Sequence, residues 1–262
     1  MSTFIHFFAF CSCFLLLSSF VSAQNDKKIT LTGHRGAAGL APENTLASVQ
    51  KALDLGCERI EIDVHQTIDK RIVVIHDKTI DRTTNGIGLI KEMNFAEIGK
   101  YSAGIKFDKN FESEKIPTLE EVIELINGRC VLVIEVKDGN SYYPDIEKNI
   151  VTIIQKYHAK KWCLVHSFSD EVLRNFHALD SEIILHKLFI KKVFYNFKKY
   201  DYVQEFSFYW KFLHKSTIKK VHKLGKKVNV WTVNEPENMQ KMVEKGVDGI
   251  ITNFPNLYKK EN

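Results

Sequence analysis

The chain has 262 residues, of which 44% are hydrophobic and 26% charged, with 13 glycines and 5 prolines. This composition is typical of a globular protein, and it excludes a disordered chain, a collagen-like repeat and a small disulfide scaffold. The formal net charge is +5 at pH 7. This excess is too small to indicate membrane binding by itself, and we expect no nucleic-acid partner.

The first 23 residues are predicted to be a signal peptide. Residues 4–21 contain no Asp, Glu, Lys or Arg, and the run closes on Val21, Ser22 and Ala23, the small-x-small pattern that signal peptidase cleaves. Cleavage after Ala23 predicts an exported protein, periplasmic or secreted, in which residues 24–262 form a single domain. Basic residues are missing before the apolar run, so an uncleaved membrane anchor is the alternative.

Three cysteines remain after cleavage, each at or just before the start of an apolar strand. They are Cys57, Cys130 and Cys163, an odd number that allows at most one disulfide. We interpret them as small buried hydrophobic residues at the base of the fold, with one disulfide as the alternative.

Short β-rich runs alternate with amphipathic patterns along the chain. Strands are expected over 29–32, 59–64, 72–75, 131–136, 163–168, 182–188, 202–208, 227–233 and 249–252. Helices are expected over 46–55, 119–126, 146–158, 171–179, 214–224 and 236–244. Asn44 or Thr45 is predicted to cap the first helix, and Thr118 with Glu121 forms a capping box for the second.

This alternation predicts a parallel sheet, and an eight-stranded TIM barrel of the α/β class needs roughly 250 residues. A doubly wound open sheet is the alternative, but no Gly-x-Gly-x-x-Gly motif opens the first helix to support its usual nucleotide site. Residues 80–117 contain no clear strand and are long for a connection. We expect them to form a small folded insertion after the third strand, over the strand ends.

One pair of strands departs from strict alternation. Val64 and Ile72 are separated by seven residues, too few for the crossover that parallel neighbours require. The two strands are therefore expected to pair antiparallel. A turn centred on residues 69–70 would place His76 opposite Asp63.

Acidic side chains occupy strand positions that should be apolar. Glu61 and Asp63 alternate with apolar neighbours, so the period of two places both carboxylates on one face. Glu135 stands near the end of a later strand. Burying unpaired carboxylates is costly, so three that converge in a barrel mouth need a cation, and oxygen ligands favour Ca²⁺ or Mg²⁺ over zinc. A Glu-x-Asp pair alone is more often part of an ion pair.

Other polar residues are expected near the same strand ends. His34 and Arg35 close the first strand, His76 and Asp77 close the third, and Lys137 follows the fourth. TIM-barrel enzymes place their active sites at the carboxyl ends of the strands. The polar groups are therefore candidates for one catalytic site.

A series of short motifs runs through nearly the whole chain after residue 23. It comprises GHRG at 33–36, PENT at 42–45, E-x-D at 61–63, T-x-D at 67–69, HD at 76–77, DRTTNGIG at 81–88, IPTLEE at 116–121, E-x-K at 135–137, SF at 167–168, WTVN at 231–234 and GIITN at 249–253. Each motif alone is weak. The ordered series resembles the glycerophosphodiester phosphodiesterase family and is highly specific for it.

The resemblance implies a barrel, a divalent metal, and hydrolysis of a glycerophosphodiester to an alcohol and sn-glycerol 3-phosphate. By position, it implies the metal ligands Glu61, Asp63 and Glu135, the acid–base pair His34 and His76, and the phosphate-binding residues Arg35 and Lys137. Such groups meet the needs of phosphodiester hydrolysis, which are charge neutralisation, nucleophile activation and protonation of the leaving alkoxide. Which histidine is the base stays open, as does attack by water or by the substrate's own glycerol hydroxyl.

The other conspicuous residues receive simpler interpretations. Glu43 and Asn44 are expected to fix the loop after the first strand, and Asp77 to orient a neighbouring histidine or metal-bound water. Trp231 is a substrate-binding candidate that would line the glycerol pocket, with a role in the core as the alternative. Seven histidines match no functional motif: His65, His158, His166, His177, His186, His214 and His222.

Residues 187–227 carry twelve lysines and only two acidic residues, Asp201 and Glu205, interleaved with aromatic residues. We interpret this segment as a solvated barrel exterior whose aromatic side chains face inward. Weak contact with anionic lipid head groups at a membrane surface is the alternative.

The leading hypothesis is thus a metal-dependent glycerophosphodiester phosphodiesterase, exported to scavenge deacylated phospholipids. A neighbouring hypothesis is a lysophospholipase D-type activity on lipids that keep one acyl chain, which requires an apolar groove. The contrasting hypothesis is a binding module that kept the barrel and lost its chemistry. Every polar group required for catalysis is present, which argues against that module. Head-group preference, the choice between Ca²⁺ and Mg²⁺, and oligomeric state stay open at this stage.

Overall fold

The computed structural model describes residues 28–190 and 196–258, so the predicted signal peptide lies outside the described residues. Within these ranges the strands are β1 (Thr30–Gly33), β2 (Arg59–Gln66), β3 (Ile72–Val74), β4 (Val131–Val136), β5 (Cys163–Ser167), β6 (Ile184–Phe189), β7 (Glu205–Tyr209), β8 (Lys227–Trp231) and β9 (Gly249–Thr252). The α-helices are α1 (Leu46–Asp54), α2 (Phe95–Ile98), α3 (Leu119–Ile126), α4 (Ile146–Lys156), α5 (Asp170–Leu179), α6 (Lys215–His222) and α7 (Pro236–Lys245).

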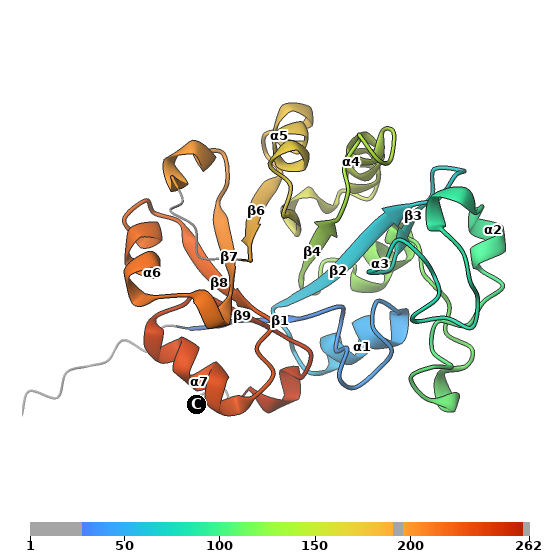
Figure 1. Cartoon of the computed structure of the whole chain (residues 1–262), viewed down its shortest axis with the longest axis horizontal. Helices are drawn as coiled ribbons and strands as arrows, with labels where there is room; N and C mark the ends of the chain where they lie inside the picture. The colour runs from blue at the N-terminus through green and yellow to red at the C-terminus, as the bar shows by residue number, and fades with distance from the viewer. Residues whose placement is uncertain (1–27, 191–195, 259–262) are drawn as a thin grey trace, which may run out of the picture.

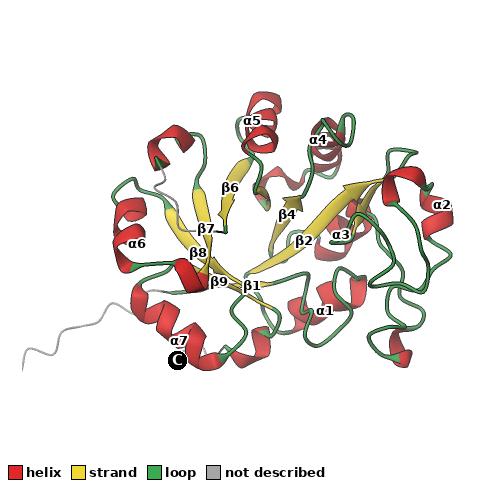
Figure 2. Ribbon diagram, in the orientation of Figure 1, coloured by secondary structure: helices red, strands yellow, loops and turns green. Residues whose placement is uncertain are grey.

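Eight of these strands form a closed parallel barrel. Their order is β1-β9-β8-β7-β6-β5-β4-β2, and β2 pairs again with β1 to complete the ring. The strands lie in the middle of the molecule and the helices surround them (Figures 1 and 2). This architecture confirms the predicted TIM barrel over the open-sheet alternative. In the described part of the chain, no helix is both long enough and apolar enough to cross a membrane.

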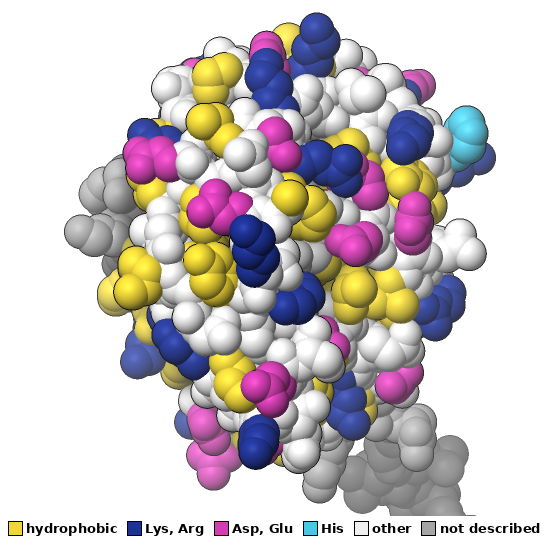
Figure 3. Space-filling model, turned by 90° about the vertical axis from the view of Figure 1, so that its right-hand side faces the viewer, with side chains coloured by type: hydrophobic (Ala, Val, Ile, Leu, Met, Phe, Trp, Pro, Cys, Tyr) yellow, Lys and Arg dark blue, Asp and Glu magenta, His cyan; other side chains and the backbone are white. Residues whose placement is uncertain are grey.

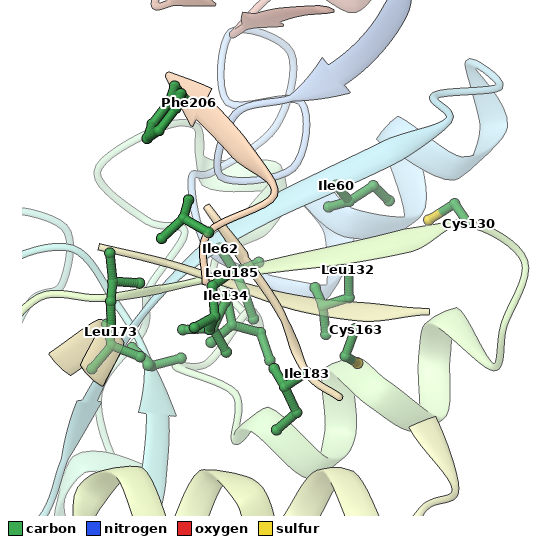
Figure 4. Packing of buried hydrophobic residues seen from close by; sticks show 14 of the residues in the cluster. Ile60, Ile62, Cys130, Leu132, Ile134, Cys163, Leu173, Ile183, Leu185 and Phe206 are labelled. Atoms are coloured by element: carbon green, nitrogen blue, oxygen red, sulfur yellow. The ribbon is translucent and has the colours of Figure 1, made fainter. Parts of the chain in front are cut away.

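The strands of the barrel separate apolar from polar residues by simple alternation. Ile60 and Ile62 of β2 and Ile134 of β4 are fully buried in one apolar cluster that also includes Leu173 of α5 (Figure 4). Each such side chain contributes about 1.5–3 kcal/mol by leaving water. The intervening residue Glu61 consequently points to the opposite face, into the barrel.

The hairpin of β2 and β3 is antiparallel, as predicted, but its register differs by one residue. Val64 pairs with Val74, and the Ile75 backbone N–H donates to the Asp63 carbonyl at 3.0 Å. Ile75 rather than His76 therefore lies opposite Asp63, and the prediction for His76 was wrong. The cause is the length of the connecting loop. The prediction assumed a two-residue turn, but the loop has three residues, 68–70, and Lys70 adopts a φ of 61° in it.

The segment between β3 and α3 folds around a small core of its own. Ile80, Ile90 and Ile98 are fully buried there, and they pack in a cluster with Val73 and Ile75 from the hairpin. The segment lies beside β3 and carries the short helix α2 (Figure 1). On this side of the molecule, acidic and basic side chains are interspersed (Figure 3).

Two strands begin later than the sequence predicts. β6 begins at Ile184 because Asp180 forms a turn, in which its Oδ1 accepts from the Glu182 backbone N–H at 3.1 Å. β7 begins at Glu205 because the Val203 N–H donates to the Tyr200 carbonyl at 3.1 Å. In both cases a local backbone turn competes with sheet pairing.

The helix caps follow the sequence signals closely. Thr45, not Asn44, caps α1 by accepting from the Ser48 backbone N–H at 3.2 Å. Thr118 and Glu121 form the predicted capping box of α3. The three remaining cysteines are free thiols buried within the apolar core, which confirms the interpretation over the disulfide alternative: Cys57, Cys130 and Cys163.

The lysine-rich segment turns most of its described aromatic side chains inward, although Phe212 is 48% exposed. Phe197, Tyr200, Phe206 and Phe208 are buried, whereas the lysines of α6 are exposed. Residues 191–195 of this segment lie outside the described residues. The inward aromatic arrangement agrees with a solvated barrel exterior.

Candidate active site

A pocket of about 260 Å³ opens at the carboxyl ends of the barrel strands. Seven of the eight predicted site residues line it: His34, Arg35, Glu61, His76, Glu135, Lys137 and Trp231. The eighth, Asp63, is fully buried beside them. The fold therefore brings together residues from strands that are far apart in the sequence.

Asp63 is held by side chains of opposite charge. Its Oδ1 lies 2.8 Å from Lys137 Nζ, and its Oδ2 lies 3.3 Å from Arg35 Nε. The Asn44 side chain donates to Oδ2 at 2.8 Å and accepts from the Asp63 backbone N–H at 3.1 Å. Burial alone would raise the pKa of Asp63, but Lys137 and Arg35 outweigh burial and hold the pKa far below its usual range.

Glu61 and Glu135 lie beside a third group, the imidazole of His166. Glu61 Oε2 accepts from the Arg35 backbone N–H at 2.8 Å, and its buried Oε1 has no hydrogen-bond partner in the described structure. Glu135 Oε1 accepts from Lys137 Nζ at 2.6 Å. Burial raises the pKa of both Glu61 and Glu135, and the nearby charge of Lys137 lowers it by less than burial raises it.

One ligand atom each from Glu61, Glu135 and His166 lies within 4.8 Å of the other two. Two carboxylates and an imidazole are ordinary ligands of a divalent cation. The unpartnered oxygen of Glu61 supports this fit, because a cation would satisfy it. These three residues could therefore hold a metal ion.

His166 is the site residue that the sequence analysis missed. It is fully covered at the end of β5, where it pairs in register with Glu135 of β4. Burial, reinforced by Lys137, lowers the pKa of His166 to about 3, so its imidazole is neutral at pH 7. Only the alignment of two neighbouring strands identifies it, because residue 166 belongs to no motif that carries chemistry.

The two predicted catalytic histidines are each fixed by one hydrogen bond. His34 Nδ1 lies 2.6 Å from Asn253 Oδ1, and its Nε2 is 4.0 Å from Glu61 Oε2. Burial lowers the pKa of His34 despite the nearby acidic groups. His76 Nδ1 lies 2.6 Å from Asp77 Oδ1, which is the orienting contact that the sequence predicts for Asp77.

A chain of ion pairs links Arg35 to the second histidine. Arg35 Nη1 donates to Glu43 Oε1 at 2.8 Å, and Arg82 donates to both oxygens of Glu43 at 2.7 and 2.9 Å. The Arg82 Nε also donates to Asp77 Oδ2 at 2.6 Å. Arg82 lies in the DRTTNGIG motif, but the sequence gives it no partner. The structure shows that it fixes Glu43 and Asp77 together.

The far wall of the pocket is apolar. Phe168, Leu188, Ile190 and Trp231 line it, and the rings of Phe168 and Trp231 meet edge to face with centroids 5.4 Å apart. The buried Nε1 of Trp231 has no hydrogen-bond acceptor in the described structure. Trp231 therefore offers an apolar face and one donor to a bound molecule.

This chain is similar to known proteins in both sequence and fold. The model of the glycerophosphoryl diester phosphodiesterase family matches residues 34–257. A glycerophosphodiester phosphodiesterase of Caldanaerobacter subterraneus subsp. tengcongensis is 37% identical over 241 residues, which cover 89% of this chain and 99% of the relative. The glycerophosphodiester phosphodiesterase of Bacillus subtilis is 30% identical over 254 residues, which cover 89% and 86%.

Among solved structures, an Oleispira antarctica phosphodiesterase in complex with the product sn-glycerol-3-phosphate is similar over 86% of this chain and 93% of its own. The TM-score is 0.81 and the sequence identity is 28%. The family match spans strands β2 to β9 and all eight predicted site residues. The chain belongs to the glycerophosphoryl diester phosphodiesterase family and is an enzyme of that family.

Proposed function

We propose that this protein hydrolyses glycerophosphodiesters to an alcohol and sn-glycerol 3-phosphate with a divalent cation and a pair of histidines. One observation carries the proposal: unpaired carboxylate and imidazole groups converge in a pocket that also holds Arg35, Lys137 and both predicted histidines. The named activity of the relatives and the product bound to the Oleispira enzyme support the substrate class.

The sequence and the pocket suggest two overlapping ligand sets for the cation. The family resemblance implies Glu61, Asp63 and Glu135, with Ca²⁺ or Mg²⁺ as the ion, whereas the convergent group is Glu61, Glu135 and His166. When bound, the cation would neutralise phosphoryl oxygens and lower the pKa of an attacking hydroxyl or water.

The two histidines differ in a way that suggests their roles. His34 is buried and its pKa is lowered, so it is neutral at pH 7 and suited to accept a proton. Its Nδ1–H donates to Asn253, which leaves the lone pair on Nε2. We assign His34 as the general base. His76, oriented by Asp77, is then the general acid for the leaving alkoxide.

The cationic side chains bind and orient the phosphate in this proposal. Arg35 and Lys137 both reach the pocket while their other contacts hold them against acidic residues. Such pre-arranged positive charge stabilises the charge that develops on the phosphoryl oxygens in the transition state.

A lysophospholipase D-type activity is the second candidate. The observation that favours it is the apolar wall, because Ile190 and Phe168 remain 51% and 37% exposed at the pocket. An acyl chain would cover these side chains, whereas glycerophosphocholine would leave them in water. Activity on lysophosphatidylcholine that exceeds activity on glycerophosphocholine would favour this candidate over the first.

The test is release of glycerol 3-phosphate from glycerophosphocholine and glycerophosphoethanolamine, followed by coupled oxidation. We expect EDTA to abolish the activity, and His34→Ala and His76→Ala each to lower kcat roughly 10²- to 10⁴-fold, the usual contribution of a general acid or base. His214→Ala, an exposed residue at the start of α6, is the control and should retain full activity. Full activity in both catalytic variants would refute the mechanism.

We further propose that the enzyme is exported and acts outside the cytoplasm on deacylated phospholipids. The support is the apolar run over residues 4–21 and the cleavage pattern that ends at Ala23. Glycerophosphodiesters are small and water-soluble, so an exported enzyme would meet them without entering a bilayer.

A further inference from the structure

The buried imidazole of His65 is bonded to the backbone of the proposed general acid. His65 lies on the same face of β2 as Glu61 and Asp63, because residues two apart on a strand point the same way. It is 1% exposed and lies outside the set of residues that line the pocket. Its Nε2 lies 2.9 Å from the backbone oxygen of His76, and its Nδ1 lies 2.9 Å from the Tyr143 hydroxyl. The ring therefore connects the segment of the acid to the loop after β4.

The chemistry of the two partners fixes the direction of both hydrogen bonds. A backbone carbonyl only accepts, so His65 Nε2 carries a proton and donates to His76. A neutral imidazole that donates through Nε2 accepts through Nδ1, so the Tyr143 hydroxyl donates to the ring. Tyr143 thereby holds His65 in the one tautomer that can bond to His76.

Tyr143 is itself held in place by the loop that carries it. The residue is 2% exposed, and its backbone N–H donates to the Gly139 carbonyl at 2.9 Å. The loop is also bonded to the end of β2, where the Gln66 side chain donates to the Pro144 carbonyl at 2.9 Å. His65 consequently receives its hydrogen bond from a donor in a fixed position.

The carbonyl that His65 holds belongs to the peptide unit between His76 and Asp77. The His76 side chain is 32% exposed, against 17% for His34, so packing restrains it less. Its Nδ1 lies 2.6 Å from Asp77 Oδ1. This contact depends on the orientation of the peptide unit that joins the two residues, because rotation of that unit moves their side chains relative to each other. A fixed carbonyl therefore helps to fix the direction in which His76 Nε2 points.

We propose that His65, held by Tyr143, is a positioning residue for the general acid. Its bond to the His76 carbonyl keeps the imidazole where Nε2–H can protonate the leaving alkoxide. The inference rests on the proposed function, in which His76 is the acid. If His65 only satisfied buried polar groups, its loss would lower stability and leave turnover unchanged.

Two amide substitutions separate the Nε2 donor from the rest of the ring. In His65→Gln the amide nitrogen can occupy the place of Nε2 and donate to the His76 carbonyl, whereas the shorter amide of His65→Asn reaches only the place of Nδ1. With glycerophosphocholine as the substrate, we expect His65→Asn to lower kcat by at least about tenfold and at most about 10²-fold, the loss that a misplaced catalytic group causes. KM should change little, because Arg35 and Lys137 keep their contacts. His65→Gln should keep most of the wild-type kcat.

Two kinetic outcomes would overturn the proposal. One is a wild-type kcat in His65→Asn. The other is an equal loss of kcat in both amide variants, which is the result expected when the site needs the imidazole only for packing.

Gln66→Met is the matched control. Gln66 is the next residue of β2 and is 3% exposed, but its hydrogen bonds go to Pro144 and Asn149 instead of to the catalytic segment. We expect the variant to lose stability in urea denaturation and to keep the wild-type kcat. A loss of kcat as large as that of His65→Asn would show that loosening the loop suffices, which would contradict a specific role for His65.

A spectroscopic measurement on the wild type covers the case in which His65→Asn does not fold. Nitrogen-15 NMR of protein labelled in its histidines distinguishes the two tautomers of a neutral ring, and comparison with His65→Gln identifies the signals of His65. We expect the Nε2–H tautomer. The Nδ1–H tautomer would refute the proposal, since no donor would then face the His76 carbonyl.

The proposed function and the positioning role fail in different ways. Wild-type protein that releases no glycerol 3-phosphate would refute the function. The same spectra then test the positioning role, because the Nδ1–H signal of His76, which reports its bond to Asp77, should be strong in His65→Gln and weak in His65→Asn. An unchanged signal in His65→Asn would overturn the role. Hydrolysis by the wild type at a rate that His65→Asn matches would support the function and overturn the positioning role alone.

Discussion

Asn44 connects the loop after β1 to the carboxylate at the centre of the site. Its φ is 58°, a left-handed conformation that asparagine tolerates better than most residues. The side chain uses this position to bond both the carboxylate and the backbone N–H of Asp63. The motif PENT therefore serves the site through a backbone conformation and a pair of hydrogen bonds.

Substitution of Asn44 should reveal which of these two properties matters more. We expect Asn44→Ala to lower the free energy of unfolding by about 1–3 kcal/mol, because buried polar atoms of Asp63 lose their partner. Asn44→Gly keeps the left-handed backbone and removes the same hydrogen bonds, so it should lose nearly as much. Urea denaturation at pH 7 measures both variants. A glycine variant as stable as the wild type would show that backbone strain dominates.

At the scale of single residues, the sequence predicts the placement of Glu61 and Asp63 better than it predicts the side chains that surround them. Period-two alternation suffices to place Glu61 and Asp63 on one face, because that geometry is local. The ion-pair chain through Arg82 depends on a segment that folds back over the pocket, which no local pattern encodes. The position of His166 in the site is not predictable from the sequence for the same reason, since only the β4–β5 register brings it beside Glu135.

Among the elements, β2 and β7 are joined through the interior of the barrel. They are not neighbours in the sheet, yet Arg59 of β2 donates two hydrogen bonds to Glu205 of β7, at 2.7 and 2.8 Å. Asn229 of β8 adds a third at 2.9 Å. Burial would raise the pKa of Glu205, but the Arg59 hydrogen bonds outweigh burial, and the pKa is lowered to about 2.

This buried pair makes the stability of the barrel depend on pH. The pKa of Glu205 is lower in the folded chain than its ordinary value of 4.5. Its contribution is therefore complete above pH 4.5 and is lost as the pH falls toward 2, and it amounts to about 3 kcal/mol. We expect Arg59→Met to lower the free energy of unfolding by about 3–5 kcal/mol at pH 7, since it leaves a buried charge unpaired.

The loss in Arg59→Met should shrink as the pH is lowered from 7 toward 3, because Glu205 then takes up a proton. Urea denaturation at several pH values measures this dependence. The double variant Arg59→Met with Glu205→Met removes both charges and should recover much of the stability. A loss below about 1 kcal/mol at pH 7, or one that does not change with pH, would contradict a stabilising role for the pair.

The strands themselves are largely predictable, but their ends and register are not. Each barrel strand carries apolar residues at the positions that face the helices, so its existence follows from the pattern of apolar residues in the sequence. The β2–β3 register depends on a loop conformation at Lys70 that many sequences share. The starts of β6 and β7 depend on turns formed by Asp180 and Tyr200, which compete with pairing at the strand ends.

For the whole molecule, the surface charge and the predicted signal peptide bear on the proposal that the enzyme works outside the cytoplasm. Most described aromatic residues of the lysine-rich segment are buried or partly buried, and Phe212 is exposed, so the segment offers lysines more than apolar anchors to a lipid surface. On the face that carries the insertion, charges of both signs are mixed (Figure 3). Together these features favour a soluble substrate over attachment to a membrane.

The proposed export predicts where the mature chain begins. Expression in a host with a secretory pathway should yield extracytoplasmic protein that begins at Gln24, as determined by mass spectrometry of its N-terminal peptide. Ala23→Arg should block cleavage, because signal peptidase requires a small residue before the cut, and the precursor should accumulate. An extracted protein that still carries residues 1–23 at its N-terminus would point to an uncleaved anchor.

The insertion after β3 shares its core with the strand that leads to a proposed catalytic residue. Ile75 packs among the insertion's isoleucines, and the next residue in the chain is His76. Exchange of this segment between relatives would therefore also shift the proposed proton donor. Engineered chimaeras should keep the hairpin and its insertion together, because a splice between them would divide one hydrophobic core.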